Sequence, residues 1–126
     1  KTSEGNVRRG PSLSHRIDWI LKLRNMPLQV VAEHGHWRKV LDFEGAGGWI
    51  HYSLLSGGRT VMIVQDHVDL RNQPTDEALT TARLERNVLA RLLSCKPDWC
   101  RLSSAGYKGW APKTALWGVT ETEIFD

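Results

Sequence analysis

The sequence predicts an all-β protein made of two small, similar units that follow each other along the chain. Three observations indicate this: an internal repeat, short runs of strand-forming residues between turn residues, and a β-branched connection between the copies. With 126 residues, the chain has the length of one domain or of two very small ones. Its 40% hydrophobic and 25% charged residues are ordinary for a globular protein and exclude wholesale disorder. No apolar run approaches the roughly 18 residues of a membrane-spanning helix, so we expect no membrane span.

The internal repeat consists of tryptophan, glycine and proline contexts that recur in the same order in both halves of the chain. Their spacing is 63 residues near the start, 62 in the middle and 61 near the end. The matched segments are Asn6–Pro11 with Asp69–Pro74, Asn25–Val31 with Asn87–Leu93, Trp37 with Trp99, and Gly48-Trp49 with Gly109-Trp110. We therefore expect one domain at residues 5–57 and a second at residues 67–118.

The connection between the two units, Arg59–Gln65, is rich in β-branched residues, and we interpret it as a strand rather than a flexible tether. Units of about 50 residues are marginally stable alone, because a short chain buries a small share of its surface. We therefore expect the two units to pack against each other through this short linker as a rigid pair.

The first unit shows three short strand candidates separated by turns. The candidates are Gln29–Ala32, Trp37–Leu41 and Gly48–His51. His34–His36 and Glu44–Gly48 contain glycines, which suit tight turns because glycine adopts positive φ without strain. Several short strands with closely spaced turns are typical of a small β-barrel or sandwich.

Residues 75–93 are ambiguous by local propensity. The segment is rich in Ala, Leu, Arg and Glu and has a capping-type start, which favours a helix. Its counterpart in the first unit contains Pro27 and the pair Val30-Val31, which a helix would resist. Tertiary context routinely overrides propensity, so we predict an extended segment over residues 87–93. A short helical turn within residues 76–82 stays open.

The anchor residues of the repeat also form a wider pattern. Asn-Val-Arg-x-Gly-Pro begins the first unit, a Trp precedes a strand, and Gly-Trp and a closing Leu follow. In the first unit the pattern falls on Asn6, Val7, Arg8, Gly10, Pro11, Trp37, Gly48, Trp49 and Leu55. In the second it falls on Leu70, Arg71, Pro74, Trp99, Gly109, Trp110 and Leu116, and it departs at Asp69 and Gln73. The chain thereby resembles a tandem of bacterial SH3 domains over nearly its whole length.

The resemblance implies two small SH3-like barrels in tandem, each of about five to seven strands. It also implies an exported protein, periplasmic or secreted, whose signal segment is not present in this sequence. Members of the family typically bind peptides or peptidoglycan fragments, often as a targeting module beside a hydrolase, and usually perform no catalysis themselves. We therefore expect a binding role and no cofactor.

Cys95 and Cys100 are the two cysteines of the chain, and through the repeat they occupy the positions of Glu33 and Arg38. If residues 33 and 38 face each other across a hairpin, they form an opposite-charge pair. The same geometry brings the two cysteines close enough to bridge, so we expect a disulfide. Two buried thiols or a redox pair are the alternatives, although the spacing differs from the Cys-x-x-Cys of redox proteins.

Signals for catalysis and metal binding are weak. The sequence has no Gly-x-Ser-x-Gly elbow and no Gly-x-x-x-x-Gly-Lys phosphate loop. His34 and His36 are too few ligands for a metal site, so we expect no metal. A cysteine nucleophile paired with His67 would be abolished by the expected disulfide. We therefore expect no catalytic residue and no enzymatic activity.

The aromatic side chains are the best candidates for a binding site. Trp19 and Tyr52 break the repeat and are therefore freer to serve function. Trp49 and His51 share one face of a regular strand, although the tryptophans at the repeat anchors are expected mainly in the cores. Two arginines near Trp19 would offer positive charge to a carboxylate or phosphate. The predicted ligand-binding residues are Trp19, Arg16, Arg24, Tyr52, His51 and Trp49. For Trp19, packing between the two units is the alternative.

Charge is spread unevenly along the chain. Residues 1–63 hold nine Lys and Arg against five Asp and Glu, whereas residues 64–126 hold eight against nine. The net charge of +3 is small for a nucleic-acid binder, so we expect no nucleic-acid partner. Weak binding of an anionic polymer through the more basic first half remains an additional hypothesis. The sequence predicts an exported module that recognises peptidoglycan peptide or another extended peptide in an aromatic groove. A protein–protein adaptor in the envelope, or one secreted to a host, is the alternative, and the oligomeric state stays open.

Overall fold

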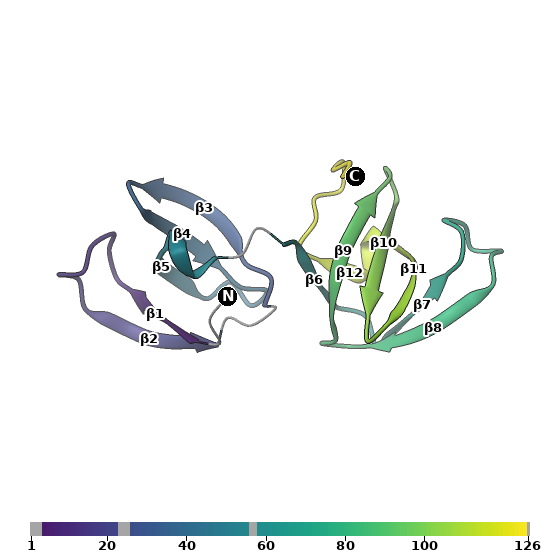
Figure 1. Ribbon diagram of the computed structural model, residues 1–126, viewed down its shortest axis with the longest axis horizontal. Helices are drawn as coiled ribbons and strands as arrows, with labels where there is room; N and C mark the ends of the chain where they lie inside the picture. Colours follow the sequence, from purple (N-terminus) through teal and green to yellow (C-terminus); the bar gives the residue numbers. More distant parts are fainter. Residues whose placement is uncertain (1–3, 23–25, 56–57, 126) are drawn as a thin grey trace. The chain divides into compact units, whose positions relative to one another are not determined.

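The computed structural model describes residues 4–22, 26–55 and 58–125. Its contacts divide the chain into two compact units, residues 1–57 and 58–126 (Figure 1). Regular structure within the described residues is almost entirely β-strand, and the two helices there are single 3₁₀ turns. No helix in this part of the chain is long and apolar enough to cross a membrane. The predicted all-β class is confirmed.

The first unit is a five-stranded antiparallel sheet. Its elements are β1 (Glu4–Arg8), β2 (Ile17–Lys22), β3 (Gln29–His34), β4 (Trp37–Leu41) and β5 (Gly47–His51), followed by the 3₁₀ turn η1 (Tyr52–Leu54). The strand order is β2-β1-β5-β4-β3, which makes β2 and β3 the two edges. The pairings among the described strands do not join these edges, so the sheet is an open form of the expected barrel.

Two turns of the first unit follow from glycine and aspartate. Gly35, with a φ of 58°, makes the β3–β4 turn that the sequence predicts. In the β4–β5 turn, the Asp42 carboxylate accepts hydrogen bonds from the amides of Glu44 and Ala46 at 2.9 and 3.0 Å. A side chain at Gly47 would collide with the backbone of β4, so glycine is required where β5 begins.

The second unit is a seven-stranded antiparallel sheet. Its elements are β6 (Thr60–Ile63), β7 (His67–Arg71), β8 (Thr80–Glu85), β9 (Leu89–Cys95), β10 (Trp99–Ser104), β11 (Tyr107–Pro112), the 3₁₀ turn η2 (Lys113–Ala115) and β12 (Leu116–Trp117). The strand order is β12-β6-β9-β10-β11-β7-β8. Strands β7 to β11 therefore repeat the order of β1 to β5, and β6 and β12 are additions on the β9 side.

The repeat extends to strand register. Val31 in β3 and Leu93 in β9 each stand unpaired between regular rungs, because the register shifts there against β4 and β10. These two positions are 62 residues apart, which is the repeat spacing in this part of the chain. The repeat inferred from side-chain types thus holds for the backbone as well.

The segment with helical propensity is strand and turn. The predicted extended segment is confirmed over most of its length, because β9 begins at Leu89. Upstream, the Ala78 amide donates to the Thr75 carbonyl at 3.2 Å, which closes a turn rather than a helix. β8 then runs from Thr80. Cross-strand packing has overridden local propensity, as the repeat indicates.

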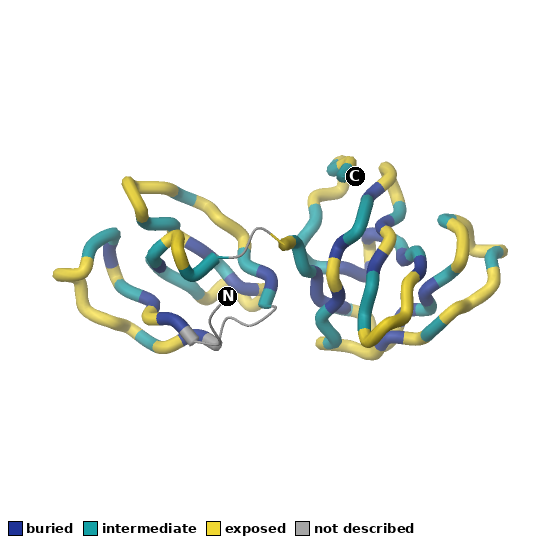
Figure 2. The backbone as a smooth tube through the Cα atoms, viewed as in Figure 1, coloured by how far each residue is buried: buried dark blue, intermediate teal, exposed yellow. Residues whose placement is uncertain are grey.

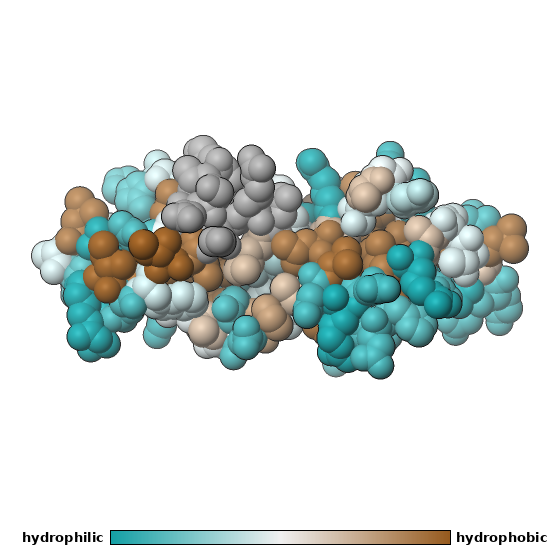
Figure 3. Space-filling view, turned by 90° about the horizontal axis from the view of Figure 1, so that it is seen from below, coloured by the Kyte–Doolittle hydropathy of each residue, from teal (hydrophilic) through white to brown (hydrophobic). Residues whose placement is uncertain are grey.

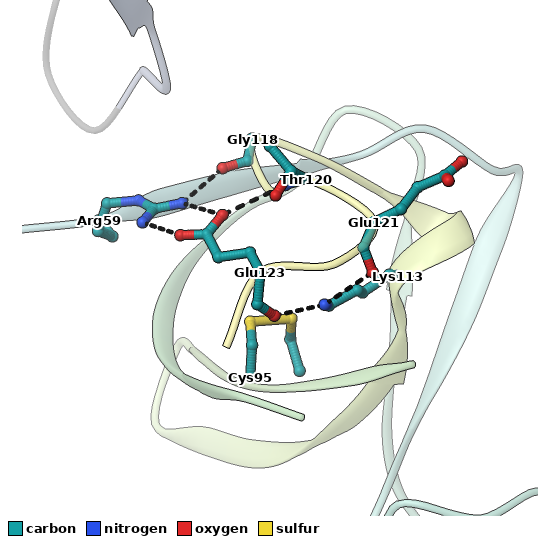
Figure 4. The surroundings of a disulfide bond; sticks show 8 residues. Arg59, Cys95, Lys113, Gly118, Thr120, Glu121 and Glu123 are labelled. Atoms are coloured by element: carbon teal, nitrogen blue, oxygen red, sulfur yellow. Dashed lines mark hydrogen bonds and ion pairs between the residues drawn. A yellow bond between two sulfur atoms is a disulfide. The ribbon is translucent and has the colours of Figure 1, made fainter. Parts of the chain in front are cut away.

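The connection expected to be a strand is β6, and it belongs to the second unit. It pairs with β9 on one side and β12 on the other. The chain end joins the same unit, since Phe125 forms a bridge to Cys95. Arg59 donates to the Gly118 carbonyl and to the Glu123 carboxylate, as Figure 4 shows. The second unit therefore extends beyond the bounds expected from the repeat.

The two units differ in the size of their cores, which Figure 2 shows as dark blue segments. The second core contains Val61, Ile63, Val68, Leu70, Leu84, Ala90, Leu92, Cys95, Cys100, Leu102, Ala111, Ala115 and Leu116. The first contains Val7, Leu21, Val40 and Ile50. Two fully buried side chains of the larger core, Val61 and Ile63, come from the added strand β6. The added strand thus accounts for part of the difference in burial.

Candidate functional site

The sheet of the first unit has a core face and an outer face. Ile50 in β5 is fully buried, so its neighbours Trp49 and His51 lie on the opposite face. Cross-strand pairing extends this outer face, because residues opposite each other share a face: His51 pairs with Trp37 in β4, and Trp49 pairs with Arg8 in β1. One aromatic and basic surface therefore spans three adjacent strands.

A hollow of about 300 Å³ lies at this surface. Its lining combines aromatic, aliphatic and polar side chains from β1, β2, β4, β5, η1 and the β1–β2 loop. The lining residues are Gly5, Asn6, Arg8, Leu13, Ile20, Trp37, His51 and Leu54. Leu13 is 76% exposed and Ile20 is 60% exposed, so apolar surface continues from the hollow into solvent. Figure 3 shows one face of the molecule, on which hydrophobic surface in brown lies among hydrophilic surface in teal.

Aromatic rings pack around His51. Its ring meets Trp37 edge-on, with 5.5 Å between ring centroids. The ring centroid of Tyr52 lies 5.0 Å from that of His51, and the Tyr52 ring stacks on the His36 ring with 5.3 Å between centroids. The Ser53 amide donates to Nδ1 of His51 at 3.2 Å, so Nδ1 is the unprotonated nitrogen of the neutral ring. The Nε2–H group is then the hydrogen-bond donor of His51.

Arg8 ties the β1–β2 loop to the sheet. Its Nη1 atom donates to the carbonyl oxygens of Leu13 at 3.1 Å and His15 at 2.9 Å. These bonds hold the exposed Leu13 side chain at the edge of the hollow and place a guanidinium charge in its wall. In the second unit, Arg71 ties the β7–β8 loop to the sheet in the same way, because it donates to the Ala78 carbonyl oxygen at 2.9 Å.

The structure separates Trp19 from the other predicted site residues. Trp19 pairs with the fully buried Val7, so it faces the core, and it packs there against the first unit's own core cluster. Arg16 is bound to Asp18, with 2.8 Å between Nε and Oδ1. The hydrogen bond from Arg16 lowers the pKa of the Asp18 carboxyl, and Arg9 adds to the effect. Arg16 thus already has an anionic partner.

Of the remaining predictions, His51 lines the hollow, Tyr52 packs on His51, and Trp49 lies on the same face. Arg24 lies outside the described residues. The sequence reasoning missed Trp37, because a repeat anchor was expected in the core. Strand alternation relative to Val40, three residues later and buried, places Trp37 on the outer face and was the available signal.

The structure contains the disulfide between Cys95 and Cys100, which are direct cross-strand partners with 4.1 Å between their Cα atoms. At the same repeat position, Glu33 and Arg38 are also direct partners. They form an ion pair, with 3.4 Å between Nε and Oε1. One hairpin is therefore closed covalently and the other ionically. Within the described residues, no three His, Cys, Asp or Glu side chains gather as a metal site.

Comparison with known proteins decides the family. The bacterial SH3 domain family matches residues 1–57 and again residues 64–118. The chain belongs to this family. Bacterial SH3 domains are binding domains and are generally non-catalytic. The resemblance read from the repeat anchors is confirmed.

Among solved structures, this bacterial SH3 chain is similar to NlpC2 from Trichomonas vaginalis, with 16% sequence identity and a TM-score of 0.45. The match covers 92% of this chain and 44% of that one, so the chain spans less than half of the solved protein. No curated protein matches the chain.

The second bacterial SH3 unit has a different surface at the position of the hollow. Asn6 and Ile20, paired between β1 and β2, correspond to Asp69 and Arg83, which form an ion pair with 3.0 Å between Oδ1 and Nε. Pro112 stands opposite Trp99, where His51 stands opposite Trp37. The aromatic and aliphatic lining is therefore a property of the first unit and not of the repeat.

Proposed function

We propose that this protein is a non-catalytic binding module that recognises cell-wall peptide, or another extended peptide, in the hollow of its first unit. The observation that carries the proposal is the hollow itself, which is lined by Trp37, His51, Ile20 and Leu13 and has Arg8 in its wall. Its volume of about 300 Å³ is at the lower end of ligand pockets, which suits one or two side chains of an extended chain.

The lining accounts for the chemistry of such a ligand. Trp37 and Ile20 offer apolar contact area, and a peptide in an extended conformation can present a side chain to them at low entropic cost. The Nε2–H group of His51 and the guanidinium of Arg8 supply donors for carbonyl and carboxylate oxygens.

The disulfide supports an extracytoplasmic location. Disulfides persist in oxidising compartments such as the periplasm and the extracellular space, and they are rare in the cytosol. A cell-wall ligand would be found in that setting. Membership of the bacterial SH3 family supports the same placement.

Co-sedimentation with purified peptidoglycan at low and high salt tests the proposal. The key variant carries Asn6→Asp with Ile20→Arg, which introduces the ion pair that the second unit already accommodates at this register. We expect the parent protein to sediment at both salt concentrations and the double variant to bind about tenfold more weakly. Trp37→Ala should have the same effect, whereas Trp99→Ala, its counterpart in the second unit, should not.

Three results would count against wall recognition through the hollow. Equal sedimentation of parent and double variant would place the binding surface elsewhere. Sedimentation at low salt alone would assign the binding to charge. Absence of sedimentation at both salt concentrations would leave the adaptor function, which the exposed Leu13 and Ile20 beside the hollow favour. Thermal unfolding followed by circular dichroism confirms that each variant is folded.

A further inference from the structure

The two sheets differ at one edge. In the second unit, β9 has β10 on one side and β6 on the other. Its counterpart β3 pairs with β4 alone among the described strands, so its other side is an open edge. The first unit therefore presents the surface that β6 covers in the second.

Hydrogen-bonding groups of β3 face this open edge. In the second unit, the Leu92 amide donates to the Arg59 carbonyl at 2.9 Å, and Ala90 pairs with Val61. Residues 28 and 30 are the counterparts of 90 and 92, because the shared bulge fixes the alignment. Backbone groups alternate along a strand, so the amides of Leu28 and Val30 point to the open edge.

Pro27 does not block this edge. It corresponds to Leu89, whose backbone amide points away from β6 because amides alternate in direction along a strand. Proline has no amide hydrogen, but at this position that hydrogen would not point to the open edge. Native edges are commonly protected by charged side chains. No charged residue lies between Met26 and Ala32, so that protection is missing here.

Burial shows that the open edge is also apolar. Val30 is 45% exposed, whereas its counterpart Leu92 is 4% exposed. Val31 is 45% exposed as well. Figure 2 shows β3 largely in yellow and β9 in blue and teal. In the second unit, Val61 and Ile63 of β6 complete the core, and they are both fully buried.

We propose that the open edge of β3 binds an extended segment of a partner polypeptide by strand addition. The segment lies antiparallel to β3, in the place that β6 takes beside β9. It carries β-branched apolar residues at two alternate positions, equivalent to Val61 and Ile63, which fill the small first core. This site is separate from the hollow, whose lining contains no residue of β3.

The probe for this site is a labelled peptide with the sequence of Arg59–Gln65, the one strand that this fold holds in the equivalent place. Binding to the full chain is followed by fluorescence anisotropy. N-methylation of the peptide at Val61 removes a donor that faces β9 in the second unit, so it should weaken binding about tenfold. N-methylation at Thr60, whose amide faces the other way, should have less than about a threefold effect.

Amide hydrogen exchange locates the bound peptide. The amides of Leu28 and Val30 should exchange at least about tenfold more slowly when the peptide is added, whereas the amide of Gln29, at the alternate position in register with Leu41 of β4, should be unchanged. In the peptide-free chain, Ala90 and Leu92 should already be protected because β6 covers them.

Three outcomes would overturn the proposal. The first is no binding at about 1 mM peptide. The second is an equal effect of the two N-methyl groups, or no slowing of exchange at Leu28 and Val30. The third is self-association of the chain in sedimentation velocity that Val30→Pro abolishes, which would assign the edge to a second copy. Failure of the strand-addition proposal would not affect the proposed function of the hollow, because that function is tested separately by peptidoglycan binding of variants at Trp37 and Ile20.

Discussion

The two units share a strand order and a bulge but differ in what covers them. The first is a five-stranded sheet with a small core, an aromatic hollow and a β3 edge that has no partner among the described strands. The second has two additional strands, a disulfide and a C-terminal segment that is bonded to β6 and β9. The repeat therefore fixes how strands pair, whereas the residues outside it fix how much each sheet buries.

Corresponding positions in the units carry different chemistry on the same backbone. Cys95 and Cys100 stand where the other hairpin has an ion pair. Asp69 and Arg83 form an ion pair where the other sheet has Asn and Ile. The second unit thus has stabilising contacts at positions where the first has apolar or weakly bonded surface. The second unit therefore holds the crosslink and the larger core, whereas the hollow proposed to bind a peptide lies in the first.

The largest expected effect is the loss of a core side chain from the second unit. Leu102→Ala removes a fully buried side chain from the larger core, so the free energy of unfolding of that unit should fall by about 2–5 kcal/mol. Urea unfolding, followed at resolved amide signals of each unit, measures this change. The transition of the first unit should stay in place. Equal shifts in both units would show that they unfold as one.

The second largest effect is the loss of the disulfide. Cys95→Ala with Cys100→Ala should lower the free energy of unfolding of the second unit by about 2 kcal/mol, because the crosslink no longer restricts the unfolded chain. The same urea experiment measures it. Glu33→Cys with Arg38→Cys is the reciprocal variant and should raise the stability of the first unit. No gain from this variant would show that the two hairpins are not interchangeable.

A smaller effect is the pH dependence of the C-terminal contact. The hydrogen bond from Arg59 holds the pKa of Glu123 below its ordinary range. Stability from a lowered carboxyl pKa is present above the ordinary value, about 4.3, and is lost as pH falls through the lowered pKa. Glu123→Gln should therefore remove less than about 1 kcal/mol at neutral pH, since the pair is partly exposed.

The measurement for Glu123 is the stability of the second unit at neutral pH and at about pH 3. The difference between parent and variant should shrink at the lower pH. Glu121→Gln is the matched control, because Lys113 contacts the backbone carbonyl of Glu121. A variant effect that stays constant with pH would mean that the carboxylate charge of Glu123 is not the source of the stabilisation.

The smallest effect concerns the ion pair of the first hairpin. Glu33→Gln should lower the stability of the first unit by a few tenths of a kcal/mol, because the Glu33 side chain is 67% exposed to screening water. The difference should vanish in 1 M salt, where the Debye length is about 3 Å. A loss of stability as large as that caused by removing the disulfide would contradict the expectation that the exposed ion pair contributes less than the crosslink.

Much of the fold follows from the sequence because repeat positions report on backbone pairing. The shared spacing overruled the helical propensity of residues 87–93 and placed both cysteines across one hairpin. The site was harder to predict. Trp19 broke the repeat, which indicated function, but its place opposite Val7 turns it toward the core. Trp37 fitted the repeat, which indicated core, but strand alternation turns it outward.

By itself, the sequence indicated the family, the two repeated units, one hairpin in each of them and the disulfide. These depend on spacing along the chain, and spacing is visible in the residue numbers. The tertiary structure alone decided which side chains line the hollow and which strand edge is open. Both depend on contacts among strands distant in sequence, where a shift of one residue moves a side chain to the other face of the sheet.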